Sequence, residues 1–118
     1  MKVLAAAVLV AASFASVAAQ EVYRVGKDVS APVPIKQVKP DYTAEAKQRR
    51  IEGMVQLDVV IKADGTVADV KVARSLDDVW GLDKQAVNAA KEWTFKPAQK
   101  DGKAVAVQVA VQMTFTLQ

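Results

Sequence analysis

The clearest pattern in the chain is an alternation of apolar and polar residues close to the C-terminus. No charged residue occurs from Ala104 to Gln118. Apolar side chains occupy every second position there, with Ala, Gln or Thr between them: Val105, Val107, Val109, Val111, Met113, Phe115 and Leu117. A period of two is typical of a β-strand with one buried face. The pattern therefore predicts a strand over residues 105–117, longer than the ~5–6 residues of an average strand.

A second alternating stretch lies in the middle of the chain. Its first run has apolar residues at Val55, Leu57, Val59 and Ile61, with Val60 breaking the alternation, and its second run has them at Ala68, Val70 and Val72. Asp64 and Gly65 stand between the two runs. An Asp-Gly pair between alternating runs favours a β-hairpin. We therefore expect two antiparallel strands joined at Asp64-Gly65.

Two other segments have the spacing of amphipathic helices. Residues 41–53 begin with a possible N-cap at Asp41 or Thr43, and Gly53 stands where a helix C-cap favours a left-handed residue. Residues 82–93 repeat apolar residues on one stripe, at Leu82, Ala86, Ala89 or Ala90, and Trp93. Pro97 forbids the second helix from continuing, and Asp101-Gly102 predicts a turn before the last strand.

The predicted order is helix, strand, strand, helix, strand. A three-stranded, antiparallel-type sheet with one apolar face needs a cover, and two amphipathic helices can supply it, so the fold class is α+β. Because the last strand follows a helix rather than a hairpin turn, we expect it at an edge of the sheet or exchanged with another chain. The alternative is a central position in the sheet.

The first 39 residues differ in composition from the rest. Residues 1–19 have one cation, Lys2, then a mainly apolar run that ends in Val17-Ala18-Ala19. This is typical of a secretory signal peptide cleaved after Ala19, with an uncleaved membrane anchor as the alternative. Residues 20–40 contain three of the four prolines and no sustained period. We therefore expect an extended lead-in over residues 20–39 and the folded domain over residues 40–118.

Composition excludes several classes of function. The formal net charge is +3, or +2 once Lys2 is removed, which is too mild and too evenly spread for a nucleic-acid protein. The chain has no histidine and no cysteine, so the commonest general base, the preferred zinc ligands and disulfides are all absent. No serine has an activating base nearby in sequence. We therefore expect no enzyme, no metal and no cofactor.

Three clusters allow both a structural and a functional interpretation. Asp77, Asp78 and Asp83 could form a calcium site, but they lack its ligand spacing and precede a helix, so helix capping is favoured. The cations Lys47, Arg49 and Arg50 could meet an anionic partner, and a solvated helix face is the favoured interpretation. The aromatic residues Trp93 and Phe95 favour core and rim positions over a ligand cage.

Beyond these patterns, the chain resembles the C-terminal domain of TonB over Pro40–Leu117. The features that carry the resemblance come in order: Pro40-x-Tyr42 with Ala46, Arg50-Ile51-Glu52-Gly53-x-Val55, Asp64-Gly65-x-Val67, Val70-x-Val72 with Ser75, Asp83 to Ala86 with Ala89, Trp93-x-Phe95-x-Pro97-Ala98, Gly102 and the closing strand with Phe115 and Leu117. Each fragment alone is weak, and the ordered set is specific. One departure is Thr43, where the family commonly has proline.

The resemblance implies a function for the last strand. TonB couples an inner-membrane, proton-driven motor complex to outer-membrane receptors, and its C-terminal domain binds an extended receptor segment, the TonB box, by strand addition. Here the receiving strand would be Val105–Phe115, and the same edge implies a homodimer by strand exchange. The lead-in is too short to resemble the spacer of the full-length transducer. We therefore expect a standalone periplasmic module, with the motor complex as a partner only if the N-terminus is an uncleaved inner-membrane anchor. The alternative is an envelope assembly protein that self-associates through the same edge.

Overall fold

The computed structural model describes residues 21–117, so the predicted signal peptide lies outside the described residues. The elements follow in the order β1 (Val22–Arg24), β2 (Val33–Lys36), α2 (Ala44–Gln48), β3 (Gly53–Ile61), β4 (Val67–Arg74), α3 (Leu82–Lys91), β5 (Thr94–Lys96), β6 (Ala98–Lys100) and β7 (Lys103–Phe115). The order α2, β3, β4, α3, β7 matches the predicted helix, strand, strand, helix, strand. The α+β class predicted from the sequence is confirmed.

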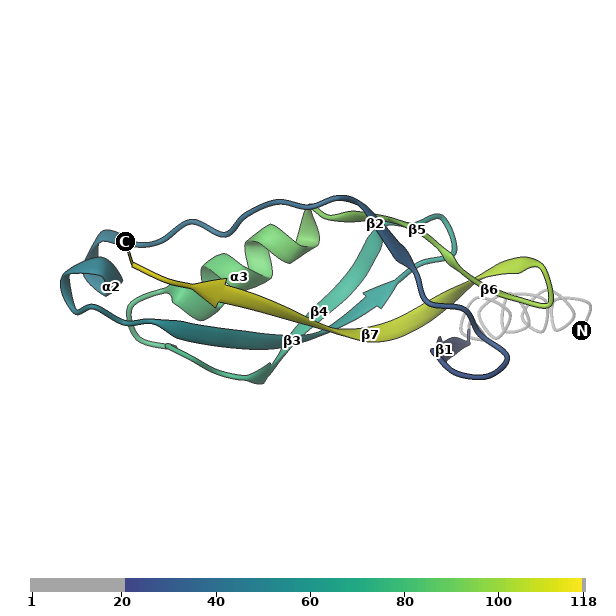
Figure 1. Ribbon diagram of the computed structural model, residues 1–118, viewed down its shortest axis with the longest axis horizontal. Coiled ribbons are helices and arrows are strands. Elements are labelled where there is room, and N and C mark those ends of the chain that lie inside the picture. Colours follow the sequence, from purple (N-terminus) through teal and green to yellow (C-terminus); the bar gives the residue numbers. More distant parts are fainter. Residues whose placement is uncertain (1–20, 118) are drawn as a thin grey trace, which may run out of the picture.

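The main sheet is built on three antiparallel strands. Its strand order is β1-β7-β3-β4, and β6 pairs with the start of β7. Strand β3 lies between β4 and β7, and its register with β7 runs from Gly53 opposite Phe115 to Ile61 opposite Val107. A separate two-stranded sheet joins β2 to β5. In Figure 1, α2 lies at the end where β7 finishes, and β1 and β6 lie at the opposite end.

The structure adds strands where the sequence predicted none. The lead-in, residues 20–39, contains β1 and β2. The turn predicted at Asp101-Gly102 is confirmed. It is a hairpin turn, so our expectation that the last strand follows a helix rather than a hairpin turn is wrong. Lys100 pairs with Lys103, and the two residues between them, Asp101 and Gly102, have φ values of 53° and 76°. Positive φ at both positions is the requirement of the type I′ turn that joins two-residue hairpins.

The hairpin predicted at Asp64-Gly65 is confirmed. The backbone N–H of Lys62 donates to the carbonyl of Thr66 at 2.8 Å and closes the turn. Asp64 Oδ1 accepts from the backbone N–H of Thr66 at 2.9 Å and from its hydroxyl at 2.6 Å. These bonds lower the pKa of the Asp64 carboxyl, the hydroxyl bond of Thr66 being the main cause. The aspartate is therefore a turn residue, as its spacing predicted.

The first helix is shorter than predicted, and Gly53 has a different role. Of the two candidate caps, Thr43 is the one used: its Oγ1 accepts from the backbone N–H of Ala46 at 3.3 Å. The helix ends at Gln48, and Arg50, with φ of 54°, takes the left-handed conformation expected of a C-cap glycine. Gly53 instead opens β3 with φ of 147°, where a Cβ would lie 2.7 Å from Cδ1 of Leu76.

The core lies between α3 and the inner face of the main sheet. The predicted stripe of α3 is buried at Leu82, Ala86, Ala89 and Ala90, against the alternate residues of β3, which are Val55, Leu57, Val59 and Ile61. Trp93 follows the helix half-buried, and Phe95 is buried beside it with 6.0 Å between the ring centroids. Pro97 separates β5 from β6. Within residues 21–117, none of the helices has the length and apolar character to span a bilayer.

Candidate functional site

The two sides of β7 have different partners. On one side β3 pairs with it from Val107 to Phe115. Strand β6 pairs with its first residues, from Lys103 to Val105. On the side opposite β3, β1 pairs with Ala106–Gln108 in parallel. In the part of the chain that the structure describes, no strand pairs on that side from Val109 to Phe115. We call this stretch the open edge. Strand β7 is thus central over its first half and an edge strand over its second half.

The predicted edge residues direct their side chains to the core. Val107, Met113 and Phe115 are buried, and Val105, Val109 and Val111 are half-buried and pack against the core. The exposed side chains of the open edge are those between them, Ala110, Gln112 and Thr114. A strand added here would therefore bind the backbone of β7, while the alternating apolar residues hold that backbone in place.

The open edge differs from the opposite edge of the sheet in its charge. Strand β4 forms that opposite edge and exposes Asp69, Lys71 and Arg74. Charged side chains on an edge strand discourage pairing with another chain. The stretch Val109–Phe115 has no charged residue. The two edges of the main sheet are thus unlike, and β7 has the one suited to accept a strand.

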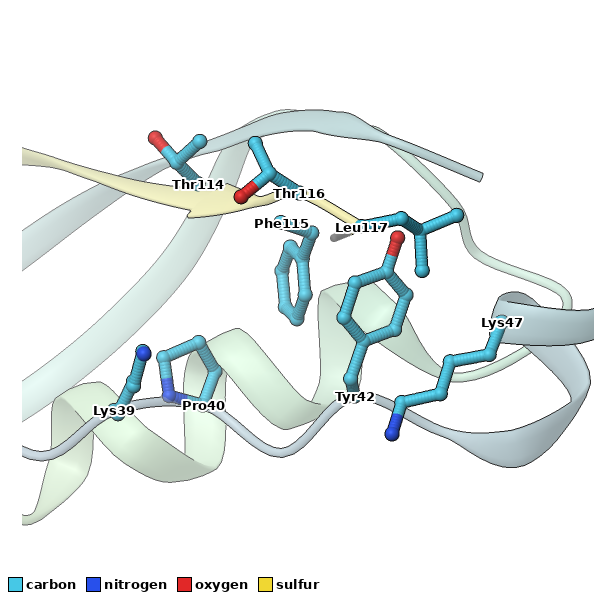
Figure 2. Close-up of a pocket in the computed structure, with 8 residues that line it drawn as sticks. All are labelled: Lys39, Pro40, Tyr42, Lys47, Thr114, Phe115, Thr116 and Leu117. Atoms are coloured by element: carbon cyan, nitrogen blue, oxygen red, sulfur yellow. The ribbon is translucent and has the colours of Figure 1, made fainter. Parts of the chain in front are cut away.

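A groove of about 500 Å³ lies beside the end of the open edge. Figure 2 shows its two walls: one is the end of β7 and the residues after it, and the other is the segment that leads to α2 together with Lys47 of α2. The first wall consists of Thr114, Phe115, Thr116 and Leu117, and the second of Lys39, Pro40, Tyr42 and Lys47. The lining contains two lysines and no acidic residue. We call it the edge groove.

Tyr42 fixes the geometry of the edge groove. Its ring meets the ring of Phe115 edge-on, with 5.4 Å between centroids and an angle of 78°. Its hydroxyl donates to the backbone carbonyl of Ile51. Burial, and next the charge of Glu52, raise the pKa of Tyr42 above its usual 10, so the hydroxyl remains a neutral donor at physiological pH. Glu52 Oε1 also accepts from the backbone N–H of Leu117 at 2.8 Å, which fixes the residues after β7.

The groove continues along the open edge as a second hollow of about 280 Å³. The two hollows share Lys39, Pro40 and Thr114. Trp93 closes the second one, since its Nε1–H donates to the carbonyl of Val38 at 2.8 Å. The segment before α2 therefore runs beside the open edge and is held there by Trp93, with a groove between the two.

The acidic loop before α3 accepts from backbone N–H groups around the start of that helix, which supports the capping interpretation, although the N-cap residue itself is Gly81 and has no side-chain cap bond. Asp77 Oδ1 accepts from the backbone N–H groups of Trp80 at 2.8 Å and Val79 at 3.0 Å, and Oδ2 accepts from that of Leu82 at 3.2 Å. Asp83 Oδ1 accepts from the backbone N–H of Asp77 at 3.0 Å. Over residues 21–117, no three acidic side chains lie close enough to form a metal site.

The cations around α2 are exposed, which supports the solvated-face interpretation. Two of them also stack on aromatic rings: the guanidinium of Arg49 lies 3.7 Å from the ring centroid of Trp80, and Lys47 Nζ lies 5.9 Å from that of Tyr42. These contacts link α2 to the loop before α3 and to the edge groove.

Sequence reasoning missed the two segments that border β7 from the lead-in. These are β1 and the residues Gln37–Pro40. A signal for β1 was present in Val22-Tyr23-Arg24-Val25, a short β-prone run that a turn with Gly26 follows. Its partner is more than eighty positions away, and periodicity alone cannot find such a pairing.

Comparison with known proteins identifies the fold and its family. The family model of the Gram-negative bacterial TonB protein C-terminal domain matches residues 38–117. Protein tonB2 of Pseudomonas aeruginosa is 38% identical over 78 residues, covering 66% of this chain and 28% of that protein. Protein TonB of Vibrio cholerae is 33% identical over 82 residues, covering 70% of this chain and 33% of that protein.

A solved structure agrees with these sequence relatives. The solution NMR structure of the Pseudomonas aeruginosa TonB C-terminal domain superposes with a TM-score of 0.60 at 29% identity, over 79% of this chain and 90% of that chain. The chain spans about a third or less of the length of the curated relatives named above. It belongs to the TonB C-terminal domain family.

Proposed function

We propose that this chain is a periplasmic TonB-type binding module that receives an extended segment of an outer-membrane receptor by strand addition along the open edge, in support of energy-dependent transport. The observation that carries the proposal is the uncharged run Val109–Phe115, which pairs with β3 on one side and, among residues 21–117, with no strand on the other. Names of relatives such as "Protein TonB" agree with it. The proposal includes no catalytic step, metal or cofactor.

The edge groove supports the same proposal. An added strand would lie about 4.8 Å from β7, on the side where Gln37–Pro40 and Tyr42 form the far wall of the groove. Main-chain hydrogen bonds to β7 would give affinity, and the side chains of the groove would select among segments. Lys39 and Lys47 add positive charge to that wall.

The test uses a synthetic peptide of the TonB box of an outer-membrane receptor from the same genome. We expect the peptide to shift the backbone amide resonances of Val109–Phe115 in the isotope-labelled protein. Because a strand pairs with its neighbour through every second residue, two N-methylated peptides provide a matched control. In one peptide, the methyl groups replace the N–H hydrogens that would face β7, and this peptide should not bind. In the other, they replace the N–H hydrogens that would face away from β7, and binding should remain intact. Unchanged amides at millimolar peptide would contradict the proposal.

Proline substitution in β7 is a poorer test than N-methylation of the peptide. Val109, for example, pairs with Val59 of β3. A proline there removes a backbone donor and strains the central pair of strands, so lost binding would not distinguish the edge from the fold.

The second candidate is an envelope assembly protein that self-associates through the open edge. The same unpaired run of β7 would then pair with a second copy of the chain. Sedimentation velocity across a wide range of concentrations, without any peptide, tests this candidate: a concentration-dependent dimer favours self-association. A monomer at every concentration excludes it.

A further inference from the structure

Strand β1 and the open edge lie on the same side of β7. The pairing of β1 ends opposite Gln108, and the open edge begins at the next residue, Val109. Tyr23 lies opposite Val107 at the centre of this parallel pairing. A partner strand that extends toward the start of β7 would need the backbone groups that β1 already occupies. The two strands therefore compete for one row of donors and acceptors.

Few side-chain contacts hold β1 on the sheet. It is three residues long, and Val22 on it is 49% exposed. Its central residue, Tyr23, is half-buried, and Lys100 Nζ lies 4.7 Å from the centroid of the tyrosine ring. A hollow of about 300 Å³ lies between the start of β1 and the hairpin residue Lys62. Strand β1 is thus held on the sheet mainly by its backbone pairing and by the ring of Tyr23.

The chain after β1 is fixed more firmly. Val29 is buried, with 6% of its surface exposed, and forms a bridge with Lys100. The backbone N–H of Ser30 donates to the carbonyl of Gln99 at 3.0 Å, and Ser30 Oγ accepts from the N–H of Gln99 at 3.0 Å. Residues before Val29 therefore form an arm on a fixed base. When the arm leaves β7, no buried residue leaves the core, and only the half-buried Tyr23 loses its packing against it. The tether keeps the arm close to its site.

We propose that Ala106–Gln108 together with Lys100 form a strand-receiving subsite that β1 fills within the same chain, and that an extended segment with an aromatic residue opposite Val107 displaces it. This inference rests on the proposed function for its biological partner. Displacement lengthens the open edge from Val109–Phe115 to Ala106–Phe115. The apparent affinity for a segment that spans both parts is its intrinsic affinity multiplied by the fraction of molecules in which the subsite is free.

The subsite can be tested with the sequence that fills it. The probe is the synthetic peptide QEVYRVG, which corresponds to residues 20–26. The host is the full chain with Tyr23→Pro, which removes a backbone donor and the ring from β1. We expect faster hydrogen exchange at Ala106–Gln108 in this variant, and we expect the peptide to shift the resonances of those amides. Tyr23→Phe retains the ring and the donor and should behave as the original chain does.

A reversible disulfide between β1 and β7 provides a second experiment. Val22 and Ala106 are paired across β1 and β7, so their Cα atoms fall within the ~4.4–6.8 Å range of a disulfide. The chain has no other cysteine. In the double variant Val22→Cys, Ala106→Cys, we expect the oxidised form to bind the receptor peptide about ten-fold more weakly than the reduced form, because the disulfide keeps the subsite filled and leaves only Val109–Phe115 for the peptide. The single variant Val22→Cys should not respond to reductant.

The outcomes separate the two proposals. If QEVYRVG shifts no amide of Ala106–Gln108 in the Tyr23→Pro variant, or if exchange there is unchanged by that substitution, the subsite is overturned and the proposed function stands. Equal affinity of the receptor peptide for the oxidised and reduced forms overturns the competition with β1. If QEVYRVG binds and the receptor peptide binds no form, the subsite stands and the proposed function falls.

Discussion

The backbone N–H of Phe95 donates to the carbonyl of Gly65 at 2.8 Å, so the tip of the β3–β4 hairpin is attached to β5. The approach is so close that a Cβ on Gly65 would lie 2.0 Å from the carbonyl oxygen of Phe95. Gly65 also has φ of 91°. Two independent constraints, backbone conformation and space, therefore require glycine at this position.

Substitution of Gly65 by alanine should destabilise the fold strongly. We expect Gly65→Ala to lower the free energy of unfolding by about 3 kcal/mol or more, from ~1–2 kcal/mol of left-handed strain and ~1–3 kcal/mol of overpacking. Gly102→Ala separates the two contributions, because Gly102 has φ of 76° and nothing within 4 Å of an added Cβ. It should cost only the ~1–2 kcal/mol of strain. Urea unfolding measures both, and equal losses would contradict the role of the Phe95 contact.

The carboxylate of Asp77 should make stability depend on pH. Burial opposes its charge, but the backbone N–H groups of Trp80, Leu82 and Val79 outweigh burial and lower the pKa of Asp77 below its ordinary value of 3.8. A depressed pKa in the folded state stabilises the protein above the unfolded value, and this contribution is lost as the pH falls below 3.8 through the folded pKa. We expect Asp77→Asn to flatten the acid limb of stability against pH in urea unfolding.

The control for Asp77 removes the acceptor as well as the charge. Asp77→Ala leaves the backbone N–H groups of the loop without their partner, at a cost of about 2–4 kcal/mol at neutral pH. Asp77→Asn retains one oxygen acceptor and should lose less. An unchanged acid limb in Asp77→Asn would show that another carboxylate dominates it.

The hydroxyl of Thr43 should join the starts of both helices. Its Oγ1 donates to the carbonyl of Trp80 at 2.8 Å and accepts from the N–H of Ala46 at 3.3 Å. We expect Thr43→Ala to lower stability by about 1–2 kcal/mol, because one hydroxyl serves as N-cap of α2 and as donor to the loop before α3. Thr43→Ser retains both bonds and should lose much less. Thermal unfolding of the pair checks this, and equal losses would assign the effect to the methyl group.

The indole N–H of Trp93 should hold the segment beside the open edge. Trp93→Phe removes the donor to Val38 while leaving an aromatic ring beside Phe95. We expect a loss of about 1 kcal/mol and faster hydrogen exchange in Gln37–Pro40. Trp80→Phe is the matched control, because within residues 21–117 the ring of Trp80 stacks on Arg49 and its indole N–H forms no hydrogen bond. If both substitutions speed hydrogen exchange in Gln37–Pro40 equally, the indole bond of Trp93 is not what holds this segment.

The sequence by itself determined the elements whose causes are local. Alternation at Val55–Ile61 predicted β3, the Asp64-Gly65 pair predicted its hairpin, and the apolar stripe from Leu82 predicted α3, since each depends on residues within a few positions. The end of α2 was misjudged for the same local reason: Arg50 takes the left-handed conformation that glycine was expected to supply, and Gly53 is kept for its close approach to Leu76.

Only the tertiary structure decided the state of β7. Its alternating residues predicted a strand, but edge or centre depends on partners far away in sequence. Val22–Arg24 reach it from the lead-in, and Ala98–Lys100 reach it through a tight turn. Short strands such as these have too little periodicity to be found alone, and they form because β7 offers backbone donors and acceptors that must be paired. The pairing with β1 ends at Gln108, and the open edge begins at Val109.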